Sequence, residues 1–142
     1  MKAGHVPGRL AAGAYILHSG LGKWSGDEQE AAGVHGMAAS AYPFLGPVPP
    51  RRFLKAVAAA EIATGTLLLT PFVPAFVAGA ALAKFSAGLL GMYWRTPGMH
   101  KPGSIWPTQE GMAVSKDVWL LGIGLGLVVD GLAGRRAARS GS

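Results

Sequence analysis

The residues from Arg52 to Trp94 form a nearly continuous apolar stretch, which is interrupted at its centre by Pro71 and Pro74. Each half is about 20 residues long, enough at about 1.5 Å per residue to cross a hydrocarbon core of roughly 30 Å. The two prolines cannot both lie inside one helix, because proline lacks an N–H donor and clashes with the preceding turn. The stretch therefore predicts two membrane-crossing helices that fold back on each other.

Charged residues are rare within this apolar stretch, and two of them, Glu61 and Lys84, lie at about the same distance from the central turn. We therefore expect both to reach a similar depth near the middle of the bilayer. An ionisable residue inside a membrane is costly, so we predict that the two contact each other. Two interpretations are open: a purely structural ion pair, or a site for a ligand or for proton transfer.

The composition favours a membrane protein. Of the 142 residues, 50% are hydrophobic and 14% are charged, whereas charged residues make up roughly 25% of soluble domains. The 22 glycines suit helices that pack closely in lipid. Cysteine is absent, which excludes disulfides, thiolate metal sites and iron–sulfur clusters. The net charge of +6 comes from cations at the ends of apolar segments, a pattern typical of membrane flanks and not of nucleic-acid binding.

The predicted fold is all-α, an integral membrane four-helix bundle that forms a single domain over residues 1–142. The first span also resembles a signal peptide, but no convincing cleavage site follows it, and we expect it to be retained. An Ala-rich stretch over residues 27–42 is expected to form a helix on the membrane surface. In the last span Gly122, Gly124 and Gly126 predict close helix packing. The spans are expected at about 8–24, 53–70, 74–94 and 114–134.

All four tryptophans fall at the connection-side ends of these helices or in the loops there, which predicts a one-sided interfacial belt. With four spans, both termini lie on the other side. The balance of cations between the two sides does not decide the orientation. The clustered arginines near the C-terminus favour cytoplasmic termini.

Several short motifs resemble the DoxX family of small four-helix bacterial membrane proteins. They are Arg9, Gly13 and Lys23 in the first span, the loop over residues 42–49, Glu61 with Gly65 in the second span, and Asp130 in the last. The chain departs from the family in a longer second connection, rich in tryptophan and proline. The resemblance implies a multi-pass protein of the bacterial plasma membrane with cytoplasmic termini. Members of the family include a subunit type of thiosulfate:quinone oxidoreductase and partners in membrane redox complexes.

Depth counting groups several polar residues near the connection side of the bundle. A neutral histidine beside a carboxylate and an ammonium can hydrogen-bond a quinone carbonyl and relay its protons. We therefore predict a polar cavity that serves as a quinone or proton site, with a packing role as the alternative for His18. The candidate residues are His18, Ser19, Glu61, Lys84, Lys116 and Asp117.

At the opposite end of the bundle, Arg9 and Asp130 are predicted to form a structural ion pair that joins the first helix to the last. No metal site is expected, because His35 with Met37 and His100 with Met99 are short pairs that lack an evident third ligand.

These features predict a redox-linked membrane protein that binds quinone or serves as a subunit of a quinone-dependent oxidoreductase. Quinone would be exchangeable, and no haem, iron–sulfur cluster or nucleotide is expected, so a partner protein would have to supply electrons. Whether the chain is itself catalytic stays open. The expected partners are the lipid bilayer and other membrane subunits. The alternatives are a non-catalytic accessory or scaffold subunit of a larger complex, and a transporter of small solutes or protons that uses Glu61 and Lys84.

Overall fold

The computed structural model describes residues 2–96, 98–109 and 111–141, and these residues are predominantly helical. The predicted all-α class is confirmed, since the paired extended backbone in the described ranges is limited to one bridge between His100 and Pro107. A helix stands at each position where a span was predicted. The helices are α1 (Val6–Trp24), α2 (Glu28–Ala41), α3 (Pro50–Leu69), α4 (Ala75–Arg95), α5 (Met112–Ser115) and α6 (Asp117–Ser140), with single 3₁₀ turns at Ala3–His5 and Pro43–Leu45.

Local sequence signals explain where the helices begin and end. The side chain of Asp27 accepts a 2.8 Å hydrogen bond from the backbone N–H of Glu30 and caps α2. Pro50 occupies the first position of α3, where its missing N–H costs nothing. At the other end, Pro71 and Pro74 confine the chain to a short turn over residues 70–74 before α4 begins.

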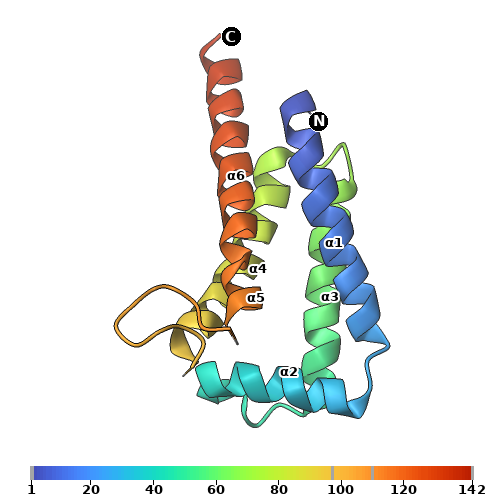
Figure 1. Ribbon diagram of the computed structural model, residues 1–142. Coiled ribbons are helices and arrows are strands. Elements are labelled where there is room, and N and C mark those ends of the chain that lie inside the picture. The colour runs from blue at the N-terminus through green and yellow to red at the C-terminus, as the bar shows by residue number, and fades with distance from the viewer. Residues whose placement is uncertain (1, 97, 110, 142) are drawn as a thin grey trace.

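The helices form two antiparallel pairs (Figure 1). One pair consists of α1 and α3, and the other consists of α4 and α6. The successive helices α3 and α4 share far fewer contacts than either pair, so the predicted helical hairpin is splayed rather than closely packed. Side chains of both pairs, including Ile16 of α1 and Leu82 of α4, nevertheless meet in one small apolar core.

Glycines explain why the pairs form as they do. A Cβ added to Gly65 of α3 would lie 2.8 Å from the backbone nitrogen of Leu17 in α1. A Cβ on Gly124 of α6 would likewise lie 2.7 Å from the backbone nitrogen of Ala83 in α4. The backbones therefore approach closely only because these positions lack side chains. The close packing predicted for Gly122 and Gly126 is wrong, since both face open space.

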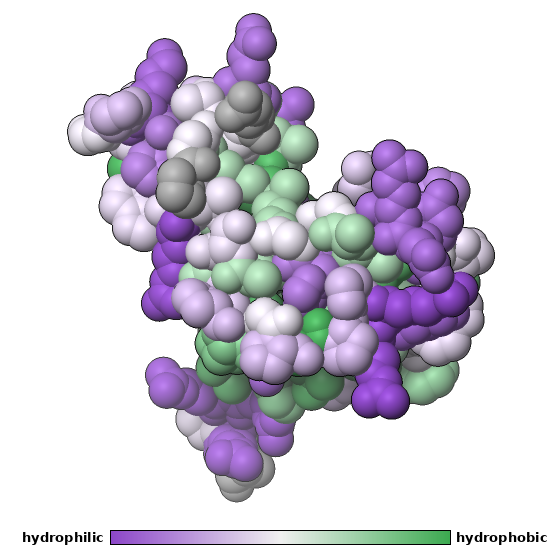
Figure 2. Space-filling view, turned by 90° about the horizontal axis from the view of Figure 1, so that it is seen from below, coloured by the Kyte–Doolittle hydropathy of each residue, from purple (hydrophilic) through white to green (hydrophobic). Residues whose placement is uncertain are grey.

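Helix α2 lies across the ends of α3 and α4 and bridges the two pairs (Figure 1). The hydroxyl of Tyr42, at its C-terminal end, donates a 2.9 Å hydrogen bond to the carbonyl of Gly88 in α4. Toward α3, the ring of His35 packs edge-on against Phe53 at 5.6 Å between centroids. Seen from below, strongly hydrophilic residues stand around the edge of the molecule, most densely on the right of the view, and less polar and apolar residues cover the middle (Figure 2).

Within the described residues, two helical segments are long and apolar enough to cross a membrane, Ala75–Arg95 and the stretch Met112–Ser140. In the most apolar 18-residue part of each segment, only 28% and 11%, respectively, is buried within the protein, so most of the apolar surface of both faces outward. The other two predicted spans, α1 and α3, are not apolar enough to count as candidate membrane spans by the same measure. Helix α3 carries Arg51, Arg52, Lys55 and Glu61, and α1 carries Arg9, His18 and Lys23, which lower the mean hydropathy of both.

Candidate functional site

A cavity of about 500 Å³ lies between the two helix pairs, and α2 closes one end of it. We call it the central cavity. Helices α1, α2, α3 and α4 and the start of α6 all contribute side chains to its walls. Its position follows from the splay between the pairs, because glycine-mediated packing draws α3 toward α1 and α4 toward α6.

The polar side of the central cavity is built from α1 and α3. The ammonium of Lys23 lies 3.1 Å from Oε1 of Glu61 and also donates a 2.6 Å hydrogen bond to the hydroxyl of Ser19. Ser19 in turn donates a longer hydrogen bond, 3.4 Å, to the same carboxylate oxygen. Because Ser19 and Lys23 are four residues apart on α1, they share the helix face that meets Glu61.

The second carboxylate oxygen of Glu61 is the most unusual atom of this cluster. Glu61 is only 5% exposed, and its Oε2 is buried with no hydrogen-bond partner among the residues that the structure describes. A buried polar atom left without a partner costs free energy, so such atoms in native structures call for an explanation. Glu61 itself lines the central cavity, so its buried carboxylate stands beside that space.

A second carboxylate faces the central cavity from the other helix pair. Asp117, the first residue of α6, lines the cavity, and its charge interacts with the charges of both Glu61 and Lys23. The remaining walls are largely apolar, with Ile16 and Phe85 among the side chains that face the space. The cavity thus combines a small group of proton-exchanging side chains with a large apolar surface.

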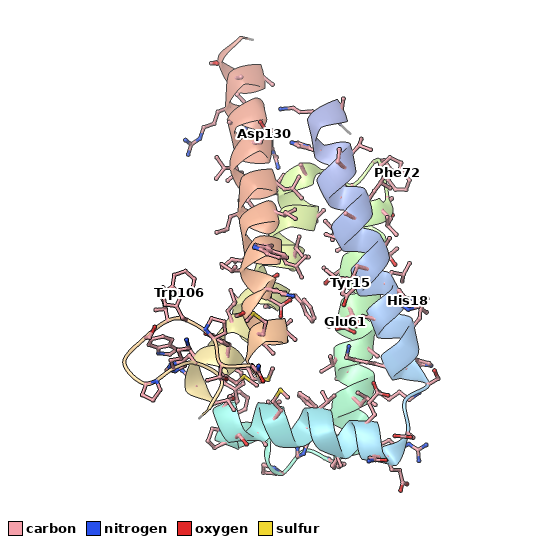
Figure 3. The ribbon with its side chains drawn as sticks, viewed as in Figure 1. Tyr15, His18, Glu61, Phe72, Trp106 and Asp130 are labelled. Atoms are coloured by element: carbon pink, nitrogen blue, oxygen red, sulfur yellow. The ribbon has the colours of Figure 1, made fainter. Side chains whose placement is uncertain are left out.

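Three of the residues predicted for this cavity lie elsewhere. His18 is exposed on the outer side of α1, whereas Glu61 lies on α3 beside α1 (Figure 3). Lys116 is exposed before α6 and does not line the cavity. Lys84 is exposed on α4 and borders a different hollow between α3 and α4.

The predicted contact between Glu61 and Lys84 is not formed. Both residues stand where counting from the turn places them along their helices. However, the arms of the hairpin splay, and Glu61 faces α1 instead of α4. Lys23, which we had interpreted as a cation at the end of the first span, is the partner that sequence reasoning missed. The spacing of four between Ser19 and Lys23 is the signal that could have indicated a shared polar face.

The predicted pair between Arg9 and Asp130 is likewise not formed. Arg9 is 1% exposed and donates to four backbone carbonyls at the end of α3 and in the following turn. Its acceptors are Leu67 at 2.9 Å, Leu68 at 2.8 Å, Thr70 at 2.8 Å and Val73 at 3.0 Å. The last carbonyls of a helix lack intrahelical donors and carry partial negative charge, so the end of α3 takes the role that we had assigned to a carboxylate.

Asp130 is held by residues that the sequence analysis did not consider. Its Oδ2 lies 2.9 Å from the ammonium of Lys2 and 2.7 Å from Nε2 of His5. These contacts still join the N-terminal segment to the last helix, as the predicted pair would have done. Lys2 precedes the 3₁₀ turn that ends at His5, and Arg9 lies in the first part of α1, so the three cations come from one short N-terminal segment.

The two histidines of the connections make contacts within the protein. Nε2 of His35 lies 2.9 Å from the carbonyl oxygen of Leu45. The ring of His100 stacks on Trp94 with 4.7 Å between centroids. The sequence analysis expected no metal site at either histidine with its neighbouring methionine, Met37 or Met99.

Comparisons with family models, curated proteins and solved structures give no match for this chain. The resemblance to the DoxX family therefore remains a prediction that rests on the short motifs.

Proposed function

We propose that this chain is an integral membrane four-helix protein that binds an isoprenoid quinone in the central cavity and acts in a quinone-dependent redox complex. The observation that carries the proposal is the buried carboxylate of Glu61 beside a largely apolar cavity, with an Oε2 that has no hydrogen-bond partner among the described residues. We further propose that the resemblance to the DoxX family reflects membership of it.

The outward-facing apolar surface supports the membrane part of the proposal. Large apolar side chains stand exposed along the helices, and contiguous apolar surface of this kind indicates contact with lipid or a partner. Among them are Leu10 and Leu21 of α1 and Leu125 and Val129 of α6, which are 50–68% exposed. The four long helices α1, α3, α4 and α6 would then all span the membrane. Charged side chains of α1 and α3 would face each other between these two helices, as Lys23 and Glu61 do.

The chemistry of the central cavity suits a quinone. A quinone has carbonyl oxygens that accept hydrogen bonds and an apolar ring and tail. Lys23 supplies a donor on one wall, a protonated Glu61 would supply another, and the apolar walls would hold the ring and the first part of the tail. The volume of about 500 Å³ falls within the range of about 300–1,000 Å³ common for small-molecule sites.

Reduction of a quinone to a quinol takes two electrons and two protons. We propose that Glu61 and Asp117 exchange protons with the bound quinone and that a redox partner protein supplies the electrons. Lys23 would stabilise the ionised form of Glu61 between proton transfers, because the two side chains are in hydrogen-bond contact.

Binding can be tested in mild detergent by mass spectrometry of copurified lipids and by titration with a short-chain quinone. Gly33 lines the central cavity on α2, and a Cβ there meets nothing within 4 Å. Gly33→Leu should fill the cavity and weaken quinone binding at least tenfold. Gly36→Leu is the matched control, because Gly36 lies on the same helix, also faces open space and does not line the cavity.

Equal binding by the two variants, or no quinone binding by the wild-type protein, would overturn the proposal. Glu61→Gln then tests the proton role. The variant should keep quinone bound and lose quinone reduction when the electron-donating partner is present. Full reduction by a stable Glu61→Gln protein would exclude Glu61 as a proton donor.

A further inference from the structure

A second hollow, of about 480 Å³, lies at the end of the helices that carries both termini. We call it the terminal cavity. Its walls come from the N-terminal segment, α1, the turn between α3 and α4, and the last part of α6. It is separate from the central cavity, and the two share no lining residue.

Cations dominate the terminal cavity. Lys2, Arg9 and Arg135 line it together with a single carboxylate, Asp130, and with His5. In the described part of the chain, neither Arg9 nor Arg135 lies within 4.0 Å of a carboxylate. The cavity therefore carries a positive potential that its own acidic group does not neutralise.

Two of the lining side chains already bind an oxyanion of the protein itself, the carboxylate of Asp130. Lys2 and His5 converge on one oxygen of that carboxylate, at 2.9 Å and 2.7 Å. The carboxylate is still 46% exposed, so its side of the cavity is open to a further group. Across the cavity, Arg135 rests on the ring of Phe76 with 4.6 Å between its Cζ and the ring centroid. That contact fixes the position of the guanidinium while its N–H groups stay available for an anion.

One wall of the terminal cavity is apolar. The turn between α3 and α4 contributes Pro71, Phe72, Val73 and Pro74. Phe72 is 86% exposed and lies at the same end of the molecule as Asp130 (Figure 3). An aromatic side chain exposed beside a group of cations suits the headgroup region of a bilayer, where a phosphate and the start of an acyl chain lie side by side.

We propose that the terminal cavity binds a phosphate group, presented by an anionic phospholipid through its headgroup. Arg135 and Lys2 would contact the phosphate oxygens, and Phe72 would contact the apolar part of the lipid. Arginine matches the geometry of phosphate oxygens, and lysine adds a point charge. The inference is independent of the proposed quinone site. Free phosphate offers the same chemistry, and the experiment separates the two sources.

The test uses the full chain in a non-ionic detergent. The affinity of the protein for phosphatidylglycerol, for phosphatidylcholine with the same acyl chains and for inorganic phosphate is measured by native mass spectrometry and by the shift of the thermal unfolding midpoint. Phosphatidylglycerol should bind at least tenfold more tightly than phosphatidylcholine. Binding of inorganic phosphate with equal affinity would instead identify a soluble phosphate compound as the ligand and overturn the lipid assignment.

Variants with opposite expected effects on lipid binding make the test specific. Arg135→Gln should weaken binding of phosphatidylglycerol about fivefold, because each cation near an anionic headgroup contributes on this scale. Lys2→Gln should do the same, and it remains informative if Arg135→Gln lowers stability, because the Lys2 side chain is 61% exposed. Asp130→Asn should tighten binding, since it removes the competing carboxylate from Lys2 and His5.

Lys101→Gln is the matched control, because Lys101 is an exposed cation in the connection at the other end of the molecule. Its binding of phosphatidylglycerol should equal that of the wild-type protein. A loss equal to that of Arg135→Gln would mean that the lipid responds to net charge and not to the terminal cavity. Weaker binding by Asp130→Asn would also overturn the proposal.

Discussion

Lys23 and Glu61 meet from the antiparallel helices α1 and α3, with the ammonium 3.1 Å from one carboxylate oxygen. The side chain of Glu61 is 7% exposed and that of Lys23 is 22% exposed, so water screens this pair poorly. The pair therefore contributes to the association of the two helices and fixes Oε1 of Glu61. Its Oε2 has no hydrogen-bond partner within the described ranges.

A double-mutant cycle should reveal this contact. Lys23→Met and Glu61→Gln should each lower the free energy of unfolding in detergent, and the double variant should lose less than the sum by about 1–3 kcal/mol. The cycle of Lys84→Met with Glu61→Gln is the control and should be additive, because Lys84 does not contact Glu61. Coupling of Glu61 to Lys84 and not to Lys23 would contradict the structure.

Arg9 should contribute strongly to stability through the end of α3. Arg9→Met removes the donor for four carbonyls and should lower the free energy of unfolding by about 2–4 kcal/mol. Arg9→Lys should recover only part of the loss, since one ammonium cannot reach all four acceptors. Thermal unfolding of the purified variants measures both effects.

The same measurement separates Arg9 from Asp130. Asp130→Asn should change the unfolding midpoint much less than Arg9→Met, because the carboxylate is half-exposed. The losses of the two variants should also add, since the residues do not contact each other. A coupling energy above about 1 kcal/mol would instead restore the direct pair that the sequence suggested.

The glycines of α6 should respond to alanine with opposite signs. Gly124→Ala should destabilise the protein by about 1–3 kcal/mol, because the new methyl group meets the backbone of α4. Gly122→Ala and Gly126→Ala face open space and should be neutral or stabilising by up to about 1 kcal/mol through helix propensity. Chemical unfolding of the three variants provides the comparison, and an equal loss in all three would argue against the packing of α6 on α4.

The proposed four-span topology predicts how introduced cysteines label in cells. The chain has no cysteine, so each variant carries a single thiol. Ser40→Cys and Lys101→Cys should react with an impermeant reagent from one side of the membrane, and Ser140→Cys only from the other. These three positions are exposed in the folded protein. Labelling of all three from the same side would exclude an odd number of membrane crossings between the connections and the C-terminal end, and with it the four-span topology.

The linear order of residues was enough to predict the helices and their approximate limits. Apolar runs about 20 residues long, punctuated by Pro71 and Pro74, predict helices with a turn between them, because proline acts on the local backbone whatever surrounds it. Depth along each helix also follows from counting, since the rise per residue is constant. For the same reason Glu61 and Lys84 do stand at matching distances from the turn.

Which residues meet was decided by the tertiary structure. A contact depends on the rotation of each helix about its axis and on the choice of neighbouring helix, and both are set by packing at a few positions such as Gly65 and Gly124. Close backbone approach there draws α3 to α1 and α4 to α6, so Glu61 faces Lys23 and turns away from Lys84. In the same way, the carbonyls at the end of α3, which lack intrahelical donors, became the partners of Arg9. Backbone acceptors of this kind leave no trace in the side-chain pattern of a sequence.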